Sequence, residues 1–193
     1  MLDVEQIRRA VHDSPRGVLG RGLGRSYGDG AQNAGGVIVD GTTAVGIIEF
    51  DPDAGRVTAK AGTSLDQLME WLVPMGWFVP VTPGTRQVTV GGAIAADIHG
   101  KNHHRKGSWC HHVLSLRLVD GRGEVRDLNP QDHPREFWAT AGGMGLTGVV
   151  LDATVQLQAI ESGKLLVDSD RATDLDAVMS LMVDGDDAYD YSV

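Results

Sequence analysis

The chain has 193 residues, 41% of them hydrophobic, and a formal net charge of −9 at pH 7. This length and hydrophobic fraction suit one domain with a packed core and exclude a wholly disordered chain. The acidic balance argues against a broad nucleic-acid surface, which needs clustered Lys and Arg.

The first half of the chain predicts short elements separated by glycine-rich turns. Ser64-Leu-Asp-Gln67 has the spacing of a capping box and predicts the start of a helix. In chain order we expect a helix at 4–11, a glycine-rich loop at 20–36, strands at 37–40, 45–50 and 56–61, a helix from Ser64 to about Val73, and an extended segment at 77–81.

The second half predicts a further hairpin and several short helices. We expect a short helix at 92–97, strands at 113–119 and 124–128, a helix at 135–141, a strand at 149–157, a helix at 173–182, a solvated acidic stretch at 184–190 and a beginning strand at 191–193. The order is mixed α+β with few βαβ units.

The glycines are the unusual feature of the composition, 26 in all, and they cluster in three segments. The strongest cluster is Gly20–Gly30, GRGLGRSYGDG, where free backbone N–H groups, Arg21, Arg25 and the Ser26 hydroxyl suit a diphosphate. The segment fails the Rossmann pattern, because Tyr27 stands where the third glycine is required, and it lacks the Gly-Lys-Ser/Thr ending of a P-loop.

Two later clusters have the same character. Residues 83–100 carry Thr85, Thr89 and the Gly91-Gly92 pair before a small-residue helix, whose N-terminus we interpret as a second anion site. Residues 142–148, GGMGLTG, form a third glycine-rich turn into a strand. A ligand that touches all three segments would be the size of a dinucleotide.

The runs GRGLGRSYGD, TPGTRQVTVGGAI, DIHGKNHH and FWAT, followed by GG and GLTG, resemble the FAD-linked oxidases of the vanillyl-alcohol oxidase/p-cresol methylhydroxylase type over most of residues 18–158. The resemblance implies an α+β FAD-binding fold of two subdomains, with mixed and antiparallel strands flanked by helices. It places an FAD-binding domain at 1–190, with subdomains at about 1–80 and 81–190, and a substrate domain beyond residue 193.

The resemblance also implies a role for each matching residue. The FAD diphosphate would be wrapped by Arg21, Gly22, Leu23, Gly24, Arg25, Ser26, Tyr27, Gly28, Asp29 and Gly30. Gly84, Thr89, Val90, Gly91 and Gly92 would line the diphosphate and ribityl region, and Ala96, Asp97, Ile98 and His99 would continue towards the isoalloxazine. Val150 would meet the adenine side through its backbone, and His99 and Lys101 would be the catalytic residues where flavin and substrate meet.

Arg25 takes the position of the histidine through which many such relatives attach flavin, so the resemblance implies non-covalent FAD. It further implies oxidation of the 2′-hydroxyl of decaprenylphosphoryl-ribose to a 2′-keto sugar, for cell-wall arabinan synthesis. The product would pass to a partner NAD(P)H-dependent keto-reductase, the flavoprotein being half of an epimerase. The fragment itself should be inactive alone.

The histidines invite a metal interpretation that their spacing does not support. His103, His104, His111 and His112, with Cys110, occur as adjacent pairs whose side chains diverge, so we expect hydrogen-bonded loop histidines and no metal. Five aromatic residues lie on apolar patterns and are expected in the core: Trp71, Trp77, Phe78, Phe137 and Trp138.

The N-terminal segment is polar, no apolar run approaches the ~20 residues that span a bilayer, and the single cysteine favours a reducing compartment. We therefore expect a soluble, cytoplasmic fragment without a transmembrane segment, while a location peripheral to the inner membrane or in the periplasm stays open for the full-length protein. Two other functions stay open: another sugar or alditol FAD oxidase, and a non-catalytic nucleotide-binding module.

Overall fold

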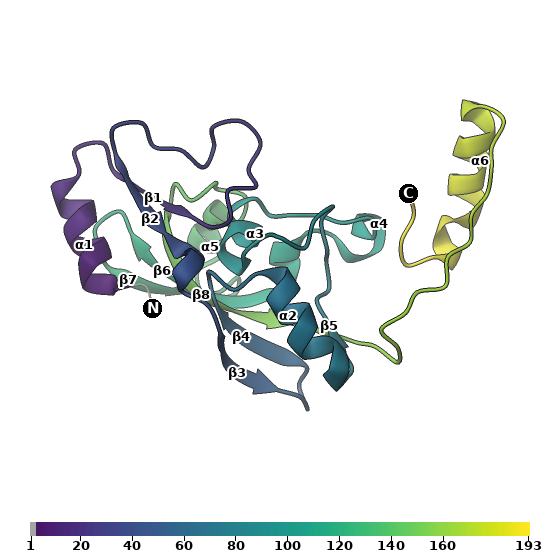
Figure 1. The fold of residues 1–193 in the computed structure, drawn as a ribbon, viewed down its shortest axis with the longest axis horizontal. Helices are drawn as coiled ribbons and strands as arrows, with labels where there is room; N and C mark the ends of the chain where they lie inside the picture. Colours follow the sequence, from purple (N-terminus) through teal and green to yellow (C-terminus); the bar gives the residue numbers. More distant parts are fainter. Residues whose placement is uncertain (1–2) are drawn as a thin grey trace.

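The computed structural model describes residues 3–193. Its centre is a five-stranded antiparallel sheet with the strand order β3-β4-β8-β6-β7 (Figure 1). The strands are β3 (Ile47–Asp51), β4 (Arg56–Lys60), β6 (Val113–Asp120), β7 (Val125–Leu128) and β8 (Gly148–Gln156). The predicted α+β class with hairpins is confirmed, and the sheet joins strands from both sides of residue 80.

Each predicted hairpin is closed by an aspartate that accepts backbone N–H groups in the turn. Asp51 Oδ1 accepts from Asp53 at 3.0 Å and Ala54 at 2.9 Å, and Asp120 Oδ1 accepts from the N–H groups of Arg122 at 2.9 Å and Glu124 at 3.0 Å. Short polar side chains stabilise turns in this way. The two turns therefore fix the register of β3–β4 and β6–β7.

Most of the helices pack against the sheet, the C-terminal helix being the exception, and side chains cap the starts of several of them. The helices are α1 (Val4–Asp13), α2 (Leu65–Leu72), α3 (Val90–Ala95), α4 (His103–Lys106), α5 (Pro134–Thr140) and α6 (Leu175–Gly185). The capping box of Ser64 and Gln67 is present at α2. The helix expected at 92–97 begins earlier, since the Thr89 hydroxyl caps it by accepting the Gly92 N–H at 3.0 Å.

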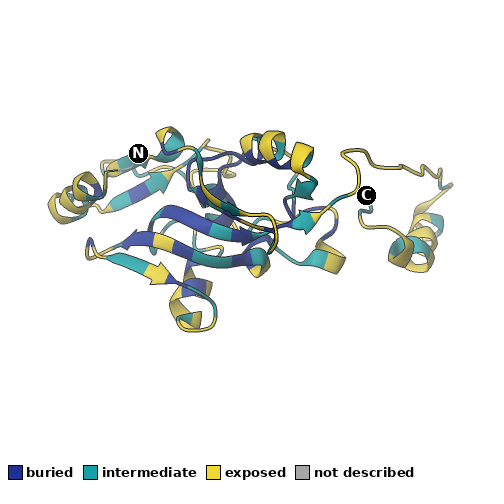
Figure 2. Ribbon diagram, turned by 90° about the horizontal axis from the view of Figure 1, so that it is seen from below, coloured by how far each residue is buried: buried dark blue, intermediate teal, exposed yellow. Residues whose placement is uncertain are grey.

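The main core lies between the sheet and helices α2, α3 and α5, where Figure 2 shows the buried residues concentrated. Trp109 and Phe137 are its largest fully buried side chains. Burial of a single leucine such as Leu68 stabilises by roughly 1.5–3 kcal/mol. The expectation that Trp71 and Trp138 lie in the core is wrong: they are 41% and 43% exposed, and they pack edge to face against Phe50 and Phe137 respectively.

Strand β1 (Val18–Arg21) is not predicted from the sequence, and it pairs in parallel with the predicted strand β2 (Val37–Asp40). Gly20 was assigned to a loop for its glycine content. In the structure it is a strand residue that lets β1 approach β8, since an added Cβ would lie 3.3 Å from Val149 Cγ1. The extended segment expected at 77–81 contains β5 (Trp77–Phe78), which pairs with the unpredicted strand β9 (Gln158–Ala159) in a separate two-stranded sheet.

The C-terminal segment projects from the body and carries α6, which has no buried residue (Figure 1). The chain then returns to α4, where Arg105 Nη1 donates to the Tyr189 carbonyl at 3.1 Å. The strand expected at 191–193 is wrong, as these residues form no ladder. Among residues 3–193, no helix combines the length and apolarity needed to cross a membrane.

Candidate functional site

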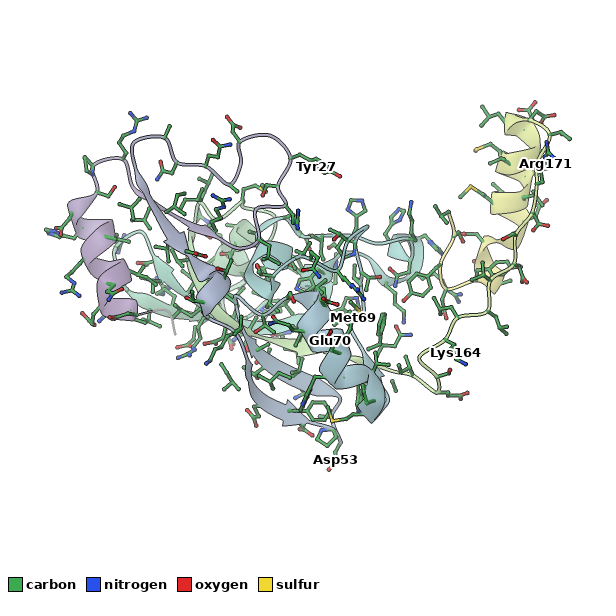
Figure 3. The ribbon with its side chains drawn as sticks, viewed as in Figure 1. Tyr27, Asp53, Met69, Glu70, Lys164 and Arg171 are labelled. Carbon is green, nitrogen blue, oxygen red and sulfur yellow. The ribbon has the colours of Figure 1, made fainter. Side chains whose placement is uncertain are left out.

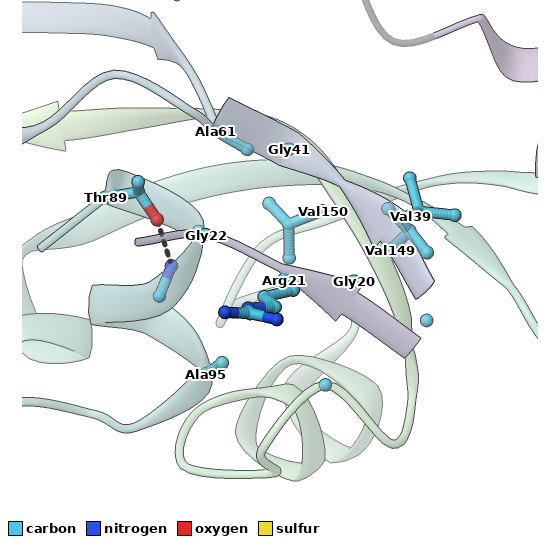
Figure 4. A pocket seen from close by; sticks show the side chains of 14 residues that line it. Gly20, Arg21, Gly22, Val39, Gly41, Ala61, Thr89, Ala95, Val149 and Val150 are labelled. Atoms are coloured by element: carbon cyan, nitrogen blue, oxygen red, sulfur yellow. Dashed lines mark hydrogen bonds between the residues drawn. The ribbon is translucent and has the colours of Figure 1, made fainter. Parts of the chain in front are cut away.

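A groove lies between the β1–β2 pair, α3 and the beginning of β8 (Figure 4). Its lining consists almost entirely of backbone and small side chains, with the Arg21 side chain reaching into it. The lining residues are Gly20, Arg21, Gly22, Val39, Gly41, Ala61, Thr89, Gly91, Gly92, Ala95, Gly145, Gly148, Val149 and Val150.

The glycines of the groove permit contacts that a side chain would prevent. A Cβ on Gly22 would lie 2.3 Å from Thr89 Oγ1, and one on Gly91 would lie 3.1 Å from Ala61 Cβ. Thr89 is almost completely buried and cannot move aside freely. The first and second glycine segments are therefore held against each other, and their backbone forms the wall of the groove.

The interpretation of the α3 N-terminus as an anion site is wrong. Its first N–H groups already have acceptors within the protein: Val90 donates to the Thr63 carbonyl and Gly91 to the Ala61 carbonyl, each at 2.8 Å, and Gly92 donates to Thr89 Oγ1. No donor in this turn is left for a ligand. The α3 residues can thus contribute shape to the groove, whereas donors must come from elsewhere.

The segment 22–30 supplies such donors. Within the described chain, no backbone N–H group of residues 23–28 makes a hydrogen bond. Gly24 and Gly28 have φ angles of 65° and 62°, the left-handed region that turns successive N–H groups to one side. Tyr27 is fully exposed and points into solvent (Figure 3). This loop has the exposed donors and the charge of Arg25 that an anionic group requires.

The third glycine segment joins the other two. The N–H groups of Gly142 and Met144 donate to the carbonyls of Ile94 at 3.0 Å and Ala95 at 2.8 Å. A Cβ on Gly30 would lie 3.0 Å from Met144 Cε. The three segments that are separate in sequence therefore converge around one groove, as a single extended ligand would require.

The structure brings together six of the predicted cofactor-binding residues in the groove lining: Arg21, Gly22, Thr89, Gly91, Gly92 and Val150. Residues 23–30 lie beside it in the exposed loop, while Gly84, Val90, Ala96, Asp97, Ile98, His99 and Lys101 lie outside the lining. Val90 is fully buried and His99 and Lys101 are exposed. Eight further lining residues are not predicted from the sequence as cofactor-binding, although Gly145 and Gly148 belong to the third glycine segment: Gly20, Val39, Gly41, Ala61, Ala95, Gly145, Gly148 and Val149.

The remaining polar cluster around residues 97–112 is internally bonded. His112 Nε2 lies 2.8 Å from the Lys106 carbonyl, and burial lowers the pKa of this histidine. Burial, with a smaller contribution from the Asp97 carboxylate, raises the pKa of the Cys110 thiol far above its usual range. Residues 3–193 hold no group of three His, Cys, Asp or Glu placed to share a metal ion.

Comparison with known families now identifies the architecture: the family described as FAD binding domain matches residues 2–129. The chain belongs to this family. FAD is accordingly the cofactor of this domain, and the groove and its exposed loop are where the described residues offer it a site.

The chain is 49% identical over 191 residues to decaprenylphosphoryl-beta-D-ribose oxidase of Mycolicibacterium smegmatis, covering 98% of this chain and 42% of that protein. It is 50% identical over 129 residues to an uncharacterized protein in the mprA 5′ region of Streptomyces coelicolor, covering 67% and 35%. The D-2-hydroxyglutarate dehydrogenase of Escherichia coli is 32% identical over 151 residues, covering 77% and 14%. The chain thus spans less than half the length of these relatives.

The FAD binding domain assignment fits the groove on physical grounds. A diphosphate needs hydrogen-bond donors and positive charge, which the 23–28 amides, Arg21 and Arg25 provide. The flat and extended parts of a dinucleotide need backbone walls without side chains, and Gly22, Gly91 and Gly92 contribute such backbone to the groove lining. The residue types that line the groove and its exposed loop therefore suit FAD.

Proposed function

We propose that this chain is the FAD-binding part of an oxidoreductase that oxidises the 2′-hydroxyl of decaprenylphosphoryl-ribose to a 2′-keto sugar. The observation that carries the proposal is the convergence of three glycine segments on one groove, in a chain that is 49% identical to an oxidase named for that substrate. The substrate domain would lie in the part of that relative that this chain does not span, so the 193 residues would be inactive alone.

In this proposal each segment has its own task. Residues 21–30 would donate hydrogen bonds to the diphosphate. Thr89, Gly91 and Gly92 of the groove lining would shape the diphosphate and ribityl region, with Gly84 and Val90 supporting them from outside the lining, and Val150 would face the adenine side through its backbone. Residues 96–99 continue to the isoalloxazine, and the exposed His99 and Lys101 face the substrate. When bound, FAD would supply the two-electron acceptor for oxidation of the alcohol, while the protein would orient both partners and exclude water.

Arg25 has no nucleophilic nitrogen free to bond the flavin, so we propose that FAD is held non-covalently. Acid precipitation of the flavin-loaded protein should release all of the flavin into the supernatant. Flavin that stays with the precipitate would contradict this point.

The proposed 2′-keto product would go to an NAD(P)H-dependent keto-reductase, the pair acting as an epimerase in arabinan synthesis for the cell wall. The substrate is lipid-linked, so the full-length protein would work at the periphery of the inner membrane. The division of the chain into subdomains at about 1–80 and 81–190 also stays a proposal.

The decisive experiment is a titration of the purified chain with FAD, followed by flavin fluorescence. We expect saturable binding that ADP competes for, because both molecules carry the diphosphate, whereas FMN competes weakly. Arg25→Ala should weaken binding, while the matched variant Arg16→Ala, an arginine outside the groove, should not. Absence of FAD binding by the wild type would overturn the proposal.

A second candidate is a non-catalytic nucleotide-binding module, which the glycine segments of this chain would suit equally well. It predicts that ADP binds as tightly as FAD. A full-length protein carrying this domain should separate the oxidases: reduction of its flavin by a polyprenylphosphoryl-ribose analogue supports the proposed substrate, and reduction only by free sugars or alditols supports another member of the family.

A further inference from the structure

Asp97 is the unusual residue of the segment 96–99, since it has a φ angle of 40° without being glycine. This left-handed conformation is unfavourable for a side chain with a Cβ and persists only where neighbouring contacts impose it. Asp97 follows Ala96, the C-cap of α3, and precedes the half-buried Ile98 and the exposed His99, in the segment that the proposed function assigns to the flavin ring.

The contacts that impose this conformation come from the segment 108–110. Asp97 Oδ1 accepts the backbone N–H of Cys110 at 2.9 Å, and Asp97 Oδ2 accepts the Ser108 hydroxyl at 2.8 Å. The next residue continues the contact, because the Trp109 N–H donates to the Ile98 carbonyl at 2.8 Å. Three successive residues of one segment are thus bound by two of the other.

The third glycine segment closes the arrangement from the opposite side. The Gly142 N–H is bonded to the carbonyl of Ile94, and a Cβ on Gly142 would lie 3.5 Å from Asp97 Cβ. Beyond Asp97 the chain pairs once more, as His99 forms an isolated antiparallel bridge with Ser108. The backbone position of His99 is therefore set by the same 108–110 segment that Asp97 binds.

Ser108, His111 and Asp97 form a Ser-His-Asp cluster, yet its order is unlike that of a hydrolase. Ser108 Oγ lies 2.8 Å from both Asp97 Oδ2 and His111 Nδ1, and the carboxylate contacts the serine, not the histidine. In a nucleophilic triad the carboxylate would orient the histidine. The cluster fits a structural role in which the serine hydroxyl is shared between two partners.

We propose that Asp97 is a positioning residue that, through Ser108 and Cys110, fixes the backbone of Ile98 and His99 at the ring end of the FAD site. This inference rests on the proposed function. In this proposal Asp97 does not contact the reacting atoms, because both oxygens of its carboxylate accept hydrogen bonds from the 108–110 segment. Asp97 would affect the flavin only through Ile98 and His99, the residues that follow it.

The test compares variants of Asp97 with a matched carboxylate far from the groove. Asp97→Ala removes both hydrogen bonds and keeps the backbone strain, Asp97→Gly removes the bonds and the strain, and Asp97→Asn keeps both bonds because its amide accepts from Cys110 and donates to Ser108. Asp120→Ala is the control, since Asp120 also accepts two turn N–H groups but lies in the β6–β7 hairpin.

Flavin-loaded Asp97→Ala and Asp97→Gly should share a shifted visible flavin spectrum and an FAD affinity weakened about threefold to tenfold. Asp97→Asn and Asp120→Ala should keep the wild-type spectrum and affinity. In the flavin-free chain, amide hydrogen exchange at Trp109 and Cys110 should be faster in Asp97→Ala than in the wild type.

An Asp97→Ala protein with the wild-type spectrum and affinity would overturn the inference alone, and so would an Asp97→Asn protein as impaired as Asp97→Ala. A wild-type chain that binds no FAD would overturn the proposed function instead, and the exchange measurement would still report whether Asp97 holds the 108–110 segment. The two failures are therefore distinguishable.

Discussion

The contact between Gly22 and Thr89 yields a quantitative prediction. In Gly22→Ala the new methyl group would lie 2.3 Å from Thr89 Oγ1, a distance that forces the buried threonine to move. The displaced hydroxyl would release the Gly92 N–H at the start of α3, a capping loss of about 0.5–2 kcal/mol. Crowding in a packed region adds about 1–3 kcal/mol.

We therefore expect Gly22→Ala to lower the free energy of unfolding by about 3 kcal/mol, measured by urea denaturation, and to lower the melting temperature by roughly 6–12 °C. Gly121→Ala is the control, because a Cβ at Gly121 would meet no atom within 4 Å. It should change the free energy of unfolding by less than about 0.5 kcal/mol.

A double-mutant cycle decides whether the clash is the cause. Thr89→Ala alone should cost about 1 kcal/mol for the lost cap. In that background Gly22→Ala should cost under about 1 kcal/mol more, since the nearest remaining atom would be Cβ of residue 89 at 3.2 Å. Additive costs in the double variant would refute the steric reasoning.

Two further predictions concern polar groups on the sheet and in the 97–112 cluster. The buried Asp152 carboxylate accepts a hydrogen bond from Arg117 Nε at 2.9 Å, and Arg117→Met removes this partner. The variant should lower the free energy of unfolding, measured in urea, by about 1–3 kcal/mol, less than for a fully buried pair because Arg117 is half exposed. Burial lowers the pKa of His112, and the positive charges of Lys106 and His111 lower it further, so the folded state favours the neutral ring. The contribution of His112 to stability is therefore full above the unfolded pKa of about 6.5 and is lost as the pH falls through the folded pKa. His112→Gln should therefore flatten the decline in melting temperature between about pH 7 and 5, and an unchanged decline would contradict this cause.

Much of the fold could be predicted because its signals are local. The hairpin at Asp51 and the capping box at Ser64 depend on residues within one turn, and both are confirmed. Strand β1 was missed because its Gly20 is explained only by the approach of Val149, a contact that no local pattern records.

The site shows the same division. The glycine segments were recognisable as ligand loops, whereas Val39, Gly41 and Ala61 joined the groove only through tertiary packing. The anion site predicted at the α3 N-terminus is wrong for a related reason. A helix start in the sequence indicates free N–H groups, but here the carbonyls of Ala61 and Thr63 accept hydrogen bonds from them. Whether a backbone donor is available to a ligand depends on partners distant in sequence.

Gly148–Val150 of the groove wall belong to β8, which pairs with β4 in the sheet. The two strands are nearly a hundred residues apart in the chain, as the contact between the Thr58 and Thr154 hydroxyls shows. During synthesis, β3 and β4 therefore leave the ribosome without the strand that completes their sheet, and their apolar face stays open until β8 emerges. Long-range pairing of this kind folds slowly. The cofactor can then be captured only by a nearly complete domain, so flavin supply would act on newly finished chains by mass action, rescuing those that close around it from aggregation or proteolysis.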